Sequence, residues 1–386
     1  MQKEIFVYAL CGDDIHIETL NLSLKYLKRF TDNEIIVVSD LSRNKINIEH
    51  HKILNVTCPK ELNNHQASIF LKTSLHKVLP KGNLYCYIDT DVLALNKDCS
   101  FVFKEYKKPI TFAQDHQSLK KFSPFAVNCS CSRKVNQRKL LLSTIKKYGI
   151  NKSETIAKKN KLEMILQRNK SSFFKTILTN IKFNISKNIY SLNDEFFFNK
   201  KEKIWRDDAN NIIMFDYDIN QVIEKETGLT YDKENKIWLN NKNENILIDS
   251  CRHLTSEIDK KFAIKDINSN WQHWNGGVFL FDDSSHSFLD SWHNKTLIIF
   301  KDEYWKTRDQ GTLIATTWEY KLENHKTLSK KWNFIADFNN SGLVLKENLT
   351  ITDDFWITEY KPSFIHIYNH WNDTSWNVWH IINKIL

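Results

Sequence analysis

Glycine, proline and long apolar runs are scarce in this chain of 386 residues. With 8 Gly and 5 Pro, the composition excludes collagen-like and Pro/Gly-rich low-complexity proteins. No stretch approaches the roughly 20 apolar residues that a membrane-spanning helix requires. The chain is nevertheless 41% hydrophobic and 13% aromatic, which excludes a disordered protein. Its length is enough to bury a substantial core, in one large domain or in two or three smaller ones.

Cysteine is present, but not in the patterns that mark disulfide frameworks or zinc ribbons. The number, seven, is odd, and no two cysteines form a C-x-x-C pair. We therefore expect reduced, buried thiols. The seven are Cys11, Cys58, Cys86, Cys99, Cys129, Cys131 and Cys251.

The net charge is positive, since 55 Lys and Arg stand against 46 Asp and Glu, and 55 − 46 = +9. Such a balance suits nucleic acid, an anionic membrane surface or a phosphorylated ligand. The lysines are scattered through Lys/Asn/Ile-rich stretches such as 158–161, which is typical of a solvated face. We therefore expect no nucleic-acid partner. The apolar run Ile5–Cys11 is too short, and its flank too acidic, for a signal peptide, so we expect a cytoplasmic protein.

Strand and helix patterns alternate at the start of the chain. Ile5–Cys11 is an apolar run that ends in turn-forming residues, and Glu34–Asp40 is a second one. Between them, leucines recur at helical spacing up to Phe30. This alternation predicts a parallel sheet covered by helices on both faces, with ligands bound outside the carboxyl ends of the strands. Ala9 and Leu10, at the end of the first run, should therefore face a ligand.

The rest of the chain shows a change of texture in its middle. A helix is predicted over about 66–79 and a strand over 84–88, and strand and helix patterns resume from Trp271. Between about 138 and 264, Lys and Asn dominate and apolar runs shorten. We interpret this stretch as an insertion with helices first and a hairpin later, whose strands 229–239 and 246–250 flank a polar turn. The expected organisation is a first half over 1–137, the insertion over 138–264 and a second half over 265–386.

Two carboxylates follow the strand at 84–88. Asp89 and Asp91 stand at positions i and i+2 of extended chain, so their side chains point to the same side and can converge on one cation. Oxygen ligands select hard cations such as Mg²⁺ or Mn²⁺. A strand-ending turn without a ligand is the alternative, because Asp is favoured in turns. The preceding apolar run places the pair at the ligand-binding edge of the predicted sheet, which favours a metal site.

Three later patterns add to this pair, each with a plain structural alternative. Asn-Gly-Gly at 275–277 lets a backbone approach a ligand closely, although a turn explains it too. Asp309 and Gln310 precede the helical run 312–318, whose N-terminus can help to hold an anion, although Asp309 is also a natural N-cap. His366 interrupts an apolar strand, where a core histidine is the alternative to a metal ligand.

Taken in order, these patterns resemble glycosyltransferase family 8, the group that includes glycogenin and bacterial lipopolysaccharide galactosyl- and glucosyltransferases. The resemblance covers about residues 4–105 and 270–371 and leaves the insertion unexplained. No single motif is specific, but their order is. The segments that carry it are Tyr87-Ile88-Asp89-Thr90-Asp91, Asn275-Gly276-Gly277-Val278-Phe279-Leu280, Asp309-Gln310, Leu328-Ser329-Lys330-Lys331-Trp332-Asn333 and Ile365-His366.

The resemblance implies the GT-A nucleotide-diphosphosugar transferase fold, a Rossmann-like mixed α/β sheet with helices on both faces, here carrying a large insertion. It implies a retaining, metal-dependent hexosyltransferase that uses a UDP-sugar donor and a glycan acceptor. By analogy the acceptor is a cell-surface polysaccharide or lipopolysaccharide, made at the inner face of the membrane. Residues 1–137 would then bind the nucleotide sugar, 138–264 would shape the acceptor side, and 265–386 would complete the metal and acceptor site.

The same resemblance assigns roles to individual residues. Asp89, Asp91 and His366 would bind Mn²⁺ (or Mg²⁺). Lys72, 89 − 72 = 17 residues before the first Asp, matches a basic donor-binding residue of the family, with Lys in place of Arg. Gln310, with Asp309 beside it, would lie near the reacting carbon. The residues expected to contact the nucleotide sugar are Ala9, Leu10, Lys72, Asp89, Thr90, Asp91, Asn275, Gly276, Gly277, Asp309, Gln310 and His370.

One position departs from the family. The family has a Lys six residues after the metal-binding His, where it holds the diphosphate, and this chain has Asn372 there. His370 or Lys361 would have to take that role.

Two other functions fit parts of the sequence. Asp89 and Asp91 also fit the first motif of haloacid-dehalogenase-like phosphatases, in which the first Asp is a nucleophile, although that motif normally ends the first strand of its domain. The 12 Trp, many of them late in the chain, would suit a non-catalytic carbohydrate-binding protein, or an ordinary core. The segment Trp371–Leu386 could also make a peripheral contact with a membrane surface, although it lacks the basic face of an interfacial helix.

Overall fold

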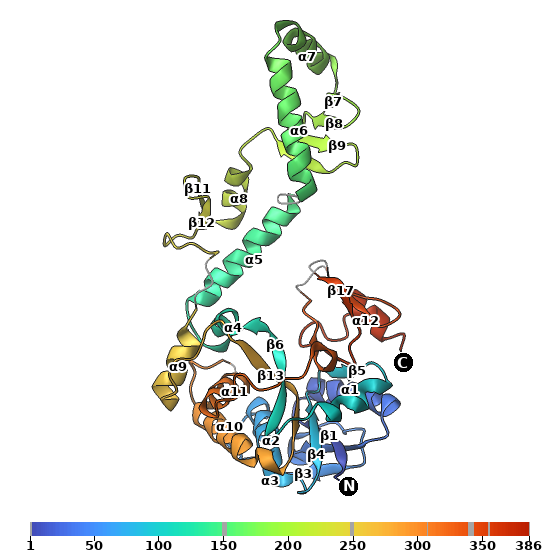
Figure 1. Ribbon diagram of the computed structural model, residues 1–386, viewed down its shortest axis with the longest axis vertical. Coiled ribbons are helices and arrows are strands. Elements are labelled where there is room, and N and C mark those ends of the chain that lie inside the picture. The colour runs from blue at the N-terminus through green and yellow to red at the C-terminus, as the bar shows by residue number, and fades with distance from the viewer. Residues whose placement is uncertain are drawn as a thin grey trace. The chain divides into compact units, whose positions relative to one another are not determined.

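The computed structural model describes residues 2–148, 153–247, 251–306, 308–338, 343–353 and 356–385. The chain forms two compact units, one made of Met1–Cys129 with Ser250–Leu386 and the other of Ser130–Asp249 (Figure 1). These boundaries correct the expected insertion at 138–264. Helix α9 (His253–Phe262) belongs to the first unit because its Leu254 and Ile258 are buried in the core around Trp305.

A six-stranded mixed sheet forms the centre of the first unit. The strand order is β3-β2-β1-β4-β13-β6. The first four strands run parallel, whereas β13 runs antiparallel to both of its neighbours. The predicted fold class, a mixed α/β sheet with helices, is therefore confirmed. The strands are β1 (Glu4–Ala9), β2 (Glu34–Ser39), β3 (Ile53–Asn55), β4 (Leu84–Ile88), β6 (Ile110–Ser118) and β13 (Gln272–Phe281).

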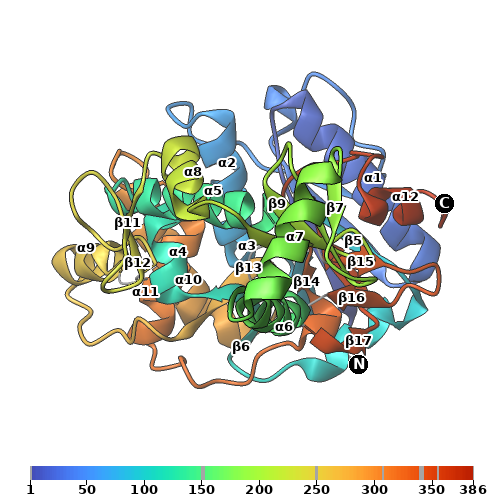
Figure 2. The same ribbon diagram turned by 90° about the horizontal axis from the view of Figure 1, so that it is seen from above.

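Helices cover both faces of this sheet because successive side chains of each strand point to opposite faces. Along β1, Phe6 and Tyr8 pack with the apolar side chains of α1, whereas Ile5 and Val7 pack with those of α2, α10 and α11. Figure 2 shows α1 on one side of the sheet and α2, α10 and α11 on the other. The helices are α1 (Asp14–Phe30), α2 (Asn64–Thr73), α3 (Leu75–Val78), α10 (His286–Ile299) and α11 (Arg308–Glu319).

A small sheet links the end of the chain to the Asp-x-Asp segment. Its order is β14-β18-β5, formed by Phe334–Ile335, Phe364–His366 and Val92–Ala94. Strand β18 runs antiparallel to β5, with His366 opposite Val92. This strand pairing therefore places His366 beside Val92, the residue that directly follows Asp91.

Helix α12 (Asn377–Ile382) lies beside α1 in Figures 1 and 2. The Tyr26 hydroxyl of α1 donates a hydrogen bond to the Ile382 carbonyl at 2.9 Å. Val378 and Trp379 are fully buried in the same cluster, so they are not available to a membrane surface as a peripheral contact would require. None of the helices in the described part of the chain combines the length and apolarity needed to cross a bilayer.

Shorter elements complete the first unit. They are the 3-10 helices η1 (Leu41–Arg43), η2 (Lys97–Glu105), η3 (Asp283–Ser285) and η4 (Lys330–Trp332), helix α4 (Leu119–Ala126), and a three-stranded sheet of β15 (Val344–Leu345), β16 (Ile351–Asp353) and β17 (Trp356–Tyr360).

The second unit begins with helices, as predicted, and continues with an antiparallel sheet, β10-β9-β8-β7, that was not predicted. The predicted strand 229–239 is itself a hairpin, with its turn at 233–236. The Asp232 carboxylate accepts backbone N–H bonds from Glu234 and Asn235, which closes the chain there. The chain also turns back at the predicted 240–245, where Leu239 forms an antiparallel bridge with Asn245 and the Ile246 N–H donates to the Trp238 carbonyl at 3.1 Å. Part of the expected second strand, 248–250, lies outside the described residues. The elements are α5 (Cys131–Lys147), α6 (Ser153–Lys170), α7 (Phe173–Ile185), β7 (Ile189–Ser191), β8 (Phe196–Asn199), β9 (Ile204–Asp207), β10 (Ile212–Phe215), α8 (Ile219–Thr227), β11 (Thr230–Asp232) and β12 (Ile237–Leu239).

Candidate active site

Asp89, Asp91 and His366 converge at the carboxyl end of β4. Their ligand atoms all lie within 4.8 Å of one another. His366 Nε2 is 3.3 Å from Asp91 Oδ1, and the Ile367 N–H donates to the Asp91 carbonyl at 2.9 Å. The structure thus brings together the three residues that the sequence predicts as metal ligands, from the first third and the end of the chain.

Two neighbours fix the imidazole of His366. A Cβ on Gly277 would lie 2.5 Å from His366 Cε1, so only glycine leaves room for the ring there. On the other side of the ring, Nδ1 is 3.1 Å from Asn333 Oδ1. Asn333 Nδ2 donates to Asn275 Oδ1, which identifies Asn333 Oδ1 as an acceptor. Nδ1 therefore carries a proton, and in the neutral ring Nε2 has its lone pair available for a cation.

Lys72 lies between two carboxylates of the site. Its Nζ is 3.1 Å from Asp89 Oδ1 and 2.9 Å from Asp309 Oδ2, and its side chain is 9% exposed. Burial alone would lower the pKa of Lys72, but the charges of Asp309 and Asp89 outweigh this effect and raise its pKa, so the ammonium stays charged. The Tyr87 hydroxyl also donates to Asp89.

The site carries an excess of negative charge that a divalent cation would balance. Three carboxylates, of Asp89, Asp91 and Asp309, face one ammonium, and 1 − 3 = −2 with a neutral imidazole. Burial raises the pKa of Asp89. Burial also opposes ionisation of Asp91, but His366 in its protonated form outweighs it and lowers the pKa of Asp91. Burial lowers the pKa of His366, but Asp91 outweighs it and raises that pKa, so the ring would have to give up this proton to bind a cation. Two carboxylates and one imidazole form a donor set that suits Mn²⁺, so the residues present fit the cation implied by the family resemblance.

A cavity of about 370 Å³ opens next to these residues, at the carboxyl ends of β1 and β4. Ligand pockets typically begin at about 300 Å³. Its polar and charged lining includes His16 and His65 as well as predicted residues. The predicted residues that line it are Ala9, Leu10, Lys72, Asp89, Thr90, Asp91 and Asp309.

The remaining predicted residues lie outside the lining of this cavity. Gln310 is held against β13, because its Oε1 accepts from the Gly276 N–H at 3.2 Å and its Nε2 donates to the Trp274 carbonyl. A Cβ on Gly276 would lie 3.2 Å from Lys72 Nζ, so this network is next to the ammonium. Asp309 and Gln310 are in the first turn of α11 itself, rather than ahead of it.

His370 is not brought to the cation residues. Its ring stacks on Phe338, with 3.5 Å between ring centroids, and its Nδ1 is 3.3 Å from Asp373 Oδ2. The side chain is 45% exposed and does not line the cavity. Its role as a donor-binding residue therefore stays a prediction: the structure shows a positive φ of 52° at this position and a ring held by the stack on Phe338.

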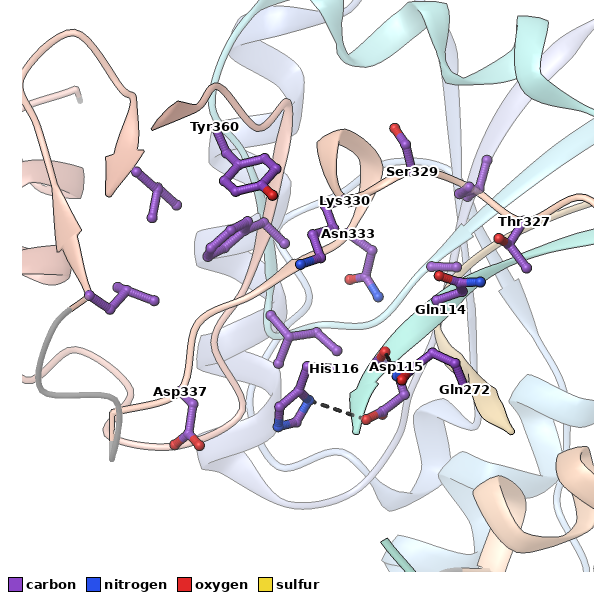
Figure 3. A pocket seen from close by; sticks show the side chains of 16 residues that line it. Gln114, Asp115, His116, Gln272, Thr327, Ser329, Lys330, Asn333, Asp337 and Tyr360 are labelled. Carbon is purple, nitrogen blue, oxygen red and sulfur yellow. Dashed lines mark hydrogen bonds and ion pairs between the residues drawn. The ribbon is translucent and has the colours of Figure 1, made fainter. Parts of the chain in front are cut away.

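A second cavity, of about 530 Å³, is lined by Asn333 together with residues at the end of β6 and in the segment 327–330 (Figure 3). Its lining includes Asp115, whose Oδ2 accepts from Asn275 Nδ2 at 3.0 Å and whose Oδ1 is 3.2 Å from His116 Nδ1. Burial opposes ionisation of Asp115, but the contacts with His116 and His273 outweigh it and hold the pKa of the carboxyl well below its usual range. A hydrogen-bonded chain thus joins His366, Asn333, Asn275 and Asp115.

Sequence reasoning did not assign Asp115 and Asn333 to the site. Asn333 closes the segment 328–333, so its position in the motif order was a usable signal. Asp115 lies late in a strand with no accompanying motif, and nothing in the sequence pairs it with Asn275.

The tryptophans serve mainly as core. Trp274, Trp292, Trp305 and Trp379 are among the largest fully buried side chains, and Trp371 is the tryptophan that lines the cavity beside the cation residues. None of the tryptophans whose burial the structure describes is exposed, so these residues offer the carbohydrate-binding alternative no exposed aromatic platform.

Comparisons with known proteins give neighbours in structure only. No family model and no curated protein matches the sequence. Mouse xyloside xylosyltransferase 1, in its apo form, is 10% identical, with a TM-score of 0.38 over 95% of this chain and 97% of its own. The apo WbbM bifunctional glycosyltransferase is also 10% identical, with a TM-score of 0.38, and this chain spans 45% of its length. Neither likeness identifies a family for this chain.

Proposed function

We propose that this protein is a divalent-cation-dependent glycosyltransferase of the GT-A kind, which moves a hexose from a UDP-sugar to a glycan acceptor with retention of configuration. The observation that carries the proposal is the convergence of Asp89, Asp91 and His366 beside a cavity at the carboxyl edge of the mixed sheet. The order of the motifs along the chain, which resembles glycosyltransferase family 8, supports UDP as the nucleotide and retention as the outcome.

The donor would occupy the 370 Å³ cavity. Ala9 and Leu10, at the end of β1, would face the nucleotide, and Asp89, Asp91 and His366 would hold Mn²⁺ at the diphosphate. The bound cation would act as a Lewis acid on the leaving diphosphate. Among the described residues that line this cavity, Lys72 is the lysine. Its charged ammonium would stabilise the negative charge that grows on the diphosphate as the sugar leaves.

Other residues of the chain keep these groups in place. Asn333 orients the His366 ring, and Asp309 holds the Lys72 ammonium. Gln310 has both ends of its amide bound to the backbone of β13, so it cannot rotate freely. Such fixed polar groups next to a reacting centre lower the reorganisation cost of the reaction.

The acceptor would occupy the second cavity. Its side chains at the end of β6, Gln114, Asp115 and His116, offer the hydrogen-bonding groups that sugar hydroxyls need (Figure 3). We expect Gln114→Ala to raise the KM for a glycan acceptor and to leave UDP release by donor hydrolysis unchanged. An equal loss in both reactions would contradict this placement, because Gln114 has no contact with the donor cavity.

The deciding experiment is a panel of nucleotide sugars incubated with Mn²⁺, in which UDP release is followed without acceptor. We expect release from one or a few UDP-sugars, and its loss with excess EDTA. Asp91→Asn should lower the rate by about 10²–10³-fold, the range for removing one group that stabilises transition-state charge. The matched control is Asp98→Asn, an exposed carboxylate in η2 that pairs with Lys331.

Three results would overturn the proposal. Full activity in excess EDTA would show that the reaction needs no divalent cation. UDP release by Asp91→Asn at the rate of Asp98→Asn would show that Asp91 has no part in the reaction. Phosphate release from a generic phosphomonoester, with no UDP formed from any UDP-sugar, would favour the phosphatase alternative.

A further inference from the structure

A second group of metal-ligating side chains lies away from the carboxylates. Cys129, Cys131, Cys251 and His253 each offer one ligand atom, and these four atoms lie within 4.8 Å of one another. Cys129 is the last residue of the first unit before the chain enters the second, and Cys131 is two residues further on. Cys251 and His253 come just after the chain returns to the first unit at residue 250. The group therefore brackets the inserted unit in the sequence.

The distances match tetrahedral zinc. Cys129 Sγ is 3.8 Å from Cys251 Sγ, and Cys251 Sγ is 3.3 Å from His253 Nδ1. Zn–S bonds of about 2.3 Å at the tetrahedral angle place two sulfurs about 3.8 Å apart, and an imidazole nitrogen at about 2.0–2.1 Å from zinc lies about 3.5 Å from each sulfur. A disulfide would need sulfurs about 2.05 Å apart, and all seven cysteines carry thiols in the structure.

The donor chemistry separates this group from the carboxylate site. Three thiolates and one imidazole are soft ligands that select zinc over Mn²⁺ or Mg²⁺. Four protein ligands fill a tetrahedral shell, which is the arrangement of structural zinc sites rather than catalytic ones.

A buried hydroxyl supports one of the sulfurs. Ser123 Oγ accepts the Leu254 N–H at 3.0 Å and lies 3.1 Å from Cys251 Sγ. Because the Ser123 oxygen already accepts a bond, its hydrogen is available to the sulfur, and Ser123 is fully buried. Hydrogen bonds of this kind orient metal ligands and are a common outer shell of metal sites.

We propose that Cys129, Cys131, Cys251 and His253 bind one structural Zn²⁺, which fixes the points where the chain leaves and re-enters the first unit. The expectation of buried thiols holds for five of the cysteines but not for Cys129 and Cys131, which are half-buried. The four residues form the pattern C-x-C followed after the insertion by C-x-H, which no C-x-x-C pair signals. The site is independent of the proposed transferase function.

The test measures zinc in the full-length protein. The protein carries Asp91→Ala throughout, so that a cation at the carboxylates does not count. It is purified under reducing conditions from zinc-supplemented cells, desalted and analysed by mass spectrometry of the metal. We expect about one zinc per chain, as a closed site of this kind retains its metal. Cys251→Ser and His253→Ala should lose most of it, whereas the control Cys99→Ser, a buried thiol of the main core, should keep it.

A second measurement covers the case in which Cys251→Ser does not fold. His253 is exposed, so His253→Ala should fold, which circular dichroism checks. Co²⁺ added to the zinc-free protein should give the intense thiolate-to-metal charge-transfer absorption of a sulfur-rich site, and His253→Ala should weaken Co²⁺ binding. Less than about a tenth of a zinc per chain, after Zn²⁺ is added back to the zinc-free protein and the excess is removed, would overturn the proposal. So would equal zinc in Cys251→Ser and Cys99→Ser, a Co²⁺ complex without charge-transfer absorption, or a Cys129–Cys251 disulfide in protein purified under reducing conditions.

Discussion

Adding one methyl group at Gly277 should disable the cation site through His366. The Cβ of Gly277→Ala would lie 2.5 Å from His366 Cε1, whereas ordinary contact begins at 3.4 Å, so the ring must move by about 0.9 Å (3.4 − 2.5 = 0.9). Overpacking of a buried site costs about 1–3 kcal/mol of unfolding free energy. Displacing a metal ligand should weaken Mn²⁺ binding by about 10–100-fold, the range found when support of a ligand is lost.

The assay is a double-mutant cycle. Urea unfolding and Mn²⁺ titration are measured for Gly277→Ala, His366→Ala and the double variant. If the methyl group acts mainly on the ring, His366→Ala removes the closest overlap and leaves only the one with Asn275 Oδ1 at 2.8 Å. Gly277→Ala should then cost less stability than in the wild type, and no further Mn²⁺ affinity, in that background. Gly276→Ala is the comparison, because the nearest atoms to its Cβ would be Lys72 Nζ at 3.2 Å and Gln310 Oε1 at 3.6 Å, and none of the three nearest belongs to His366. Equal costs of Gly277→Ala in both backgrounds would show that the methyl group does not act through His366.

Two further predictions concern buried charges. Lys72→Met should lower the free energy of unfolding by about 3–5 kcal/mol, because it leaves the carboxylates of Asp89 and Asp309 without a positive partner. Added Mn²⁺ should restore part of the thermal stability. A melting temperature equal to that of the wild type would contradict this prediction. Burial lowers the pKa of His76 and of His293 to about 4, against about 6.5 in the unfolded chain. Between about pH 6.5 and pH 4 the unfolded state therefore binds more protons than the folded state. The free energy of unfolding should fall as the pH is lowered through this range. The loss at pH 5 should be about 2 kcal/mol for one such histidine, measured as urea midpoints at pH 8 and pH 5, and a flat profile would speak against neutral buried imidazoles.

The first unit was readable from the sequence where burial is continuous. Strands β1, β2 and β4 are apolar runs followed by turn-forming residues, so both their existence and the position of Asp89 at a carboxyl edge follow from local pattern. The second unit was less readable because its strands are only three or four residues long and their cores, such as the one around Trp205, form from distant pieces. Its boundaries depend on α9, whose packing partners lie far away in the sequence.

The candidate site was readable in composition but not in its connections. His366 alone is as compatible with a core as with a ligand, and the β18–β5 pairing that decides its position joins segments far apart in the chain. The same applies to the bond between Asn275 and Asp115, and to the meeting of Cys129 with Cys251. Local sequence patterns report local structure, whereas these contacts depend on the complete topology.

The most direct test of the central claim is a crystal soaked with MnCl₂ and UDP, with anomalous diffraction measured near the manganese absorption edge. We expect one anomalous peak with Asp89, Asp91 and His366 Nε2 at about 2.0–2.6 Å from it. A fully occupied peak elsewhere, or none at these three residues while UDP is bound in the cavity, would contradict it.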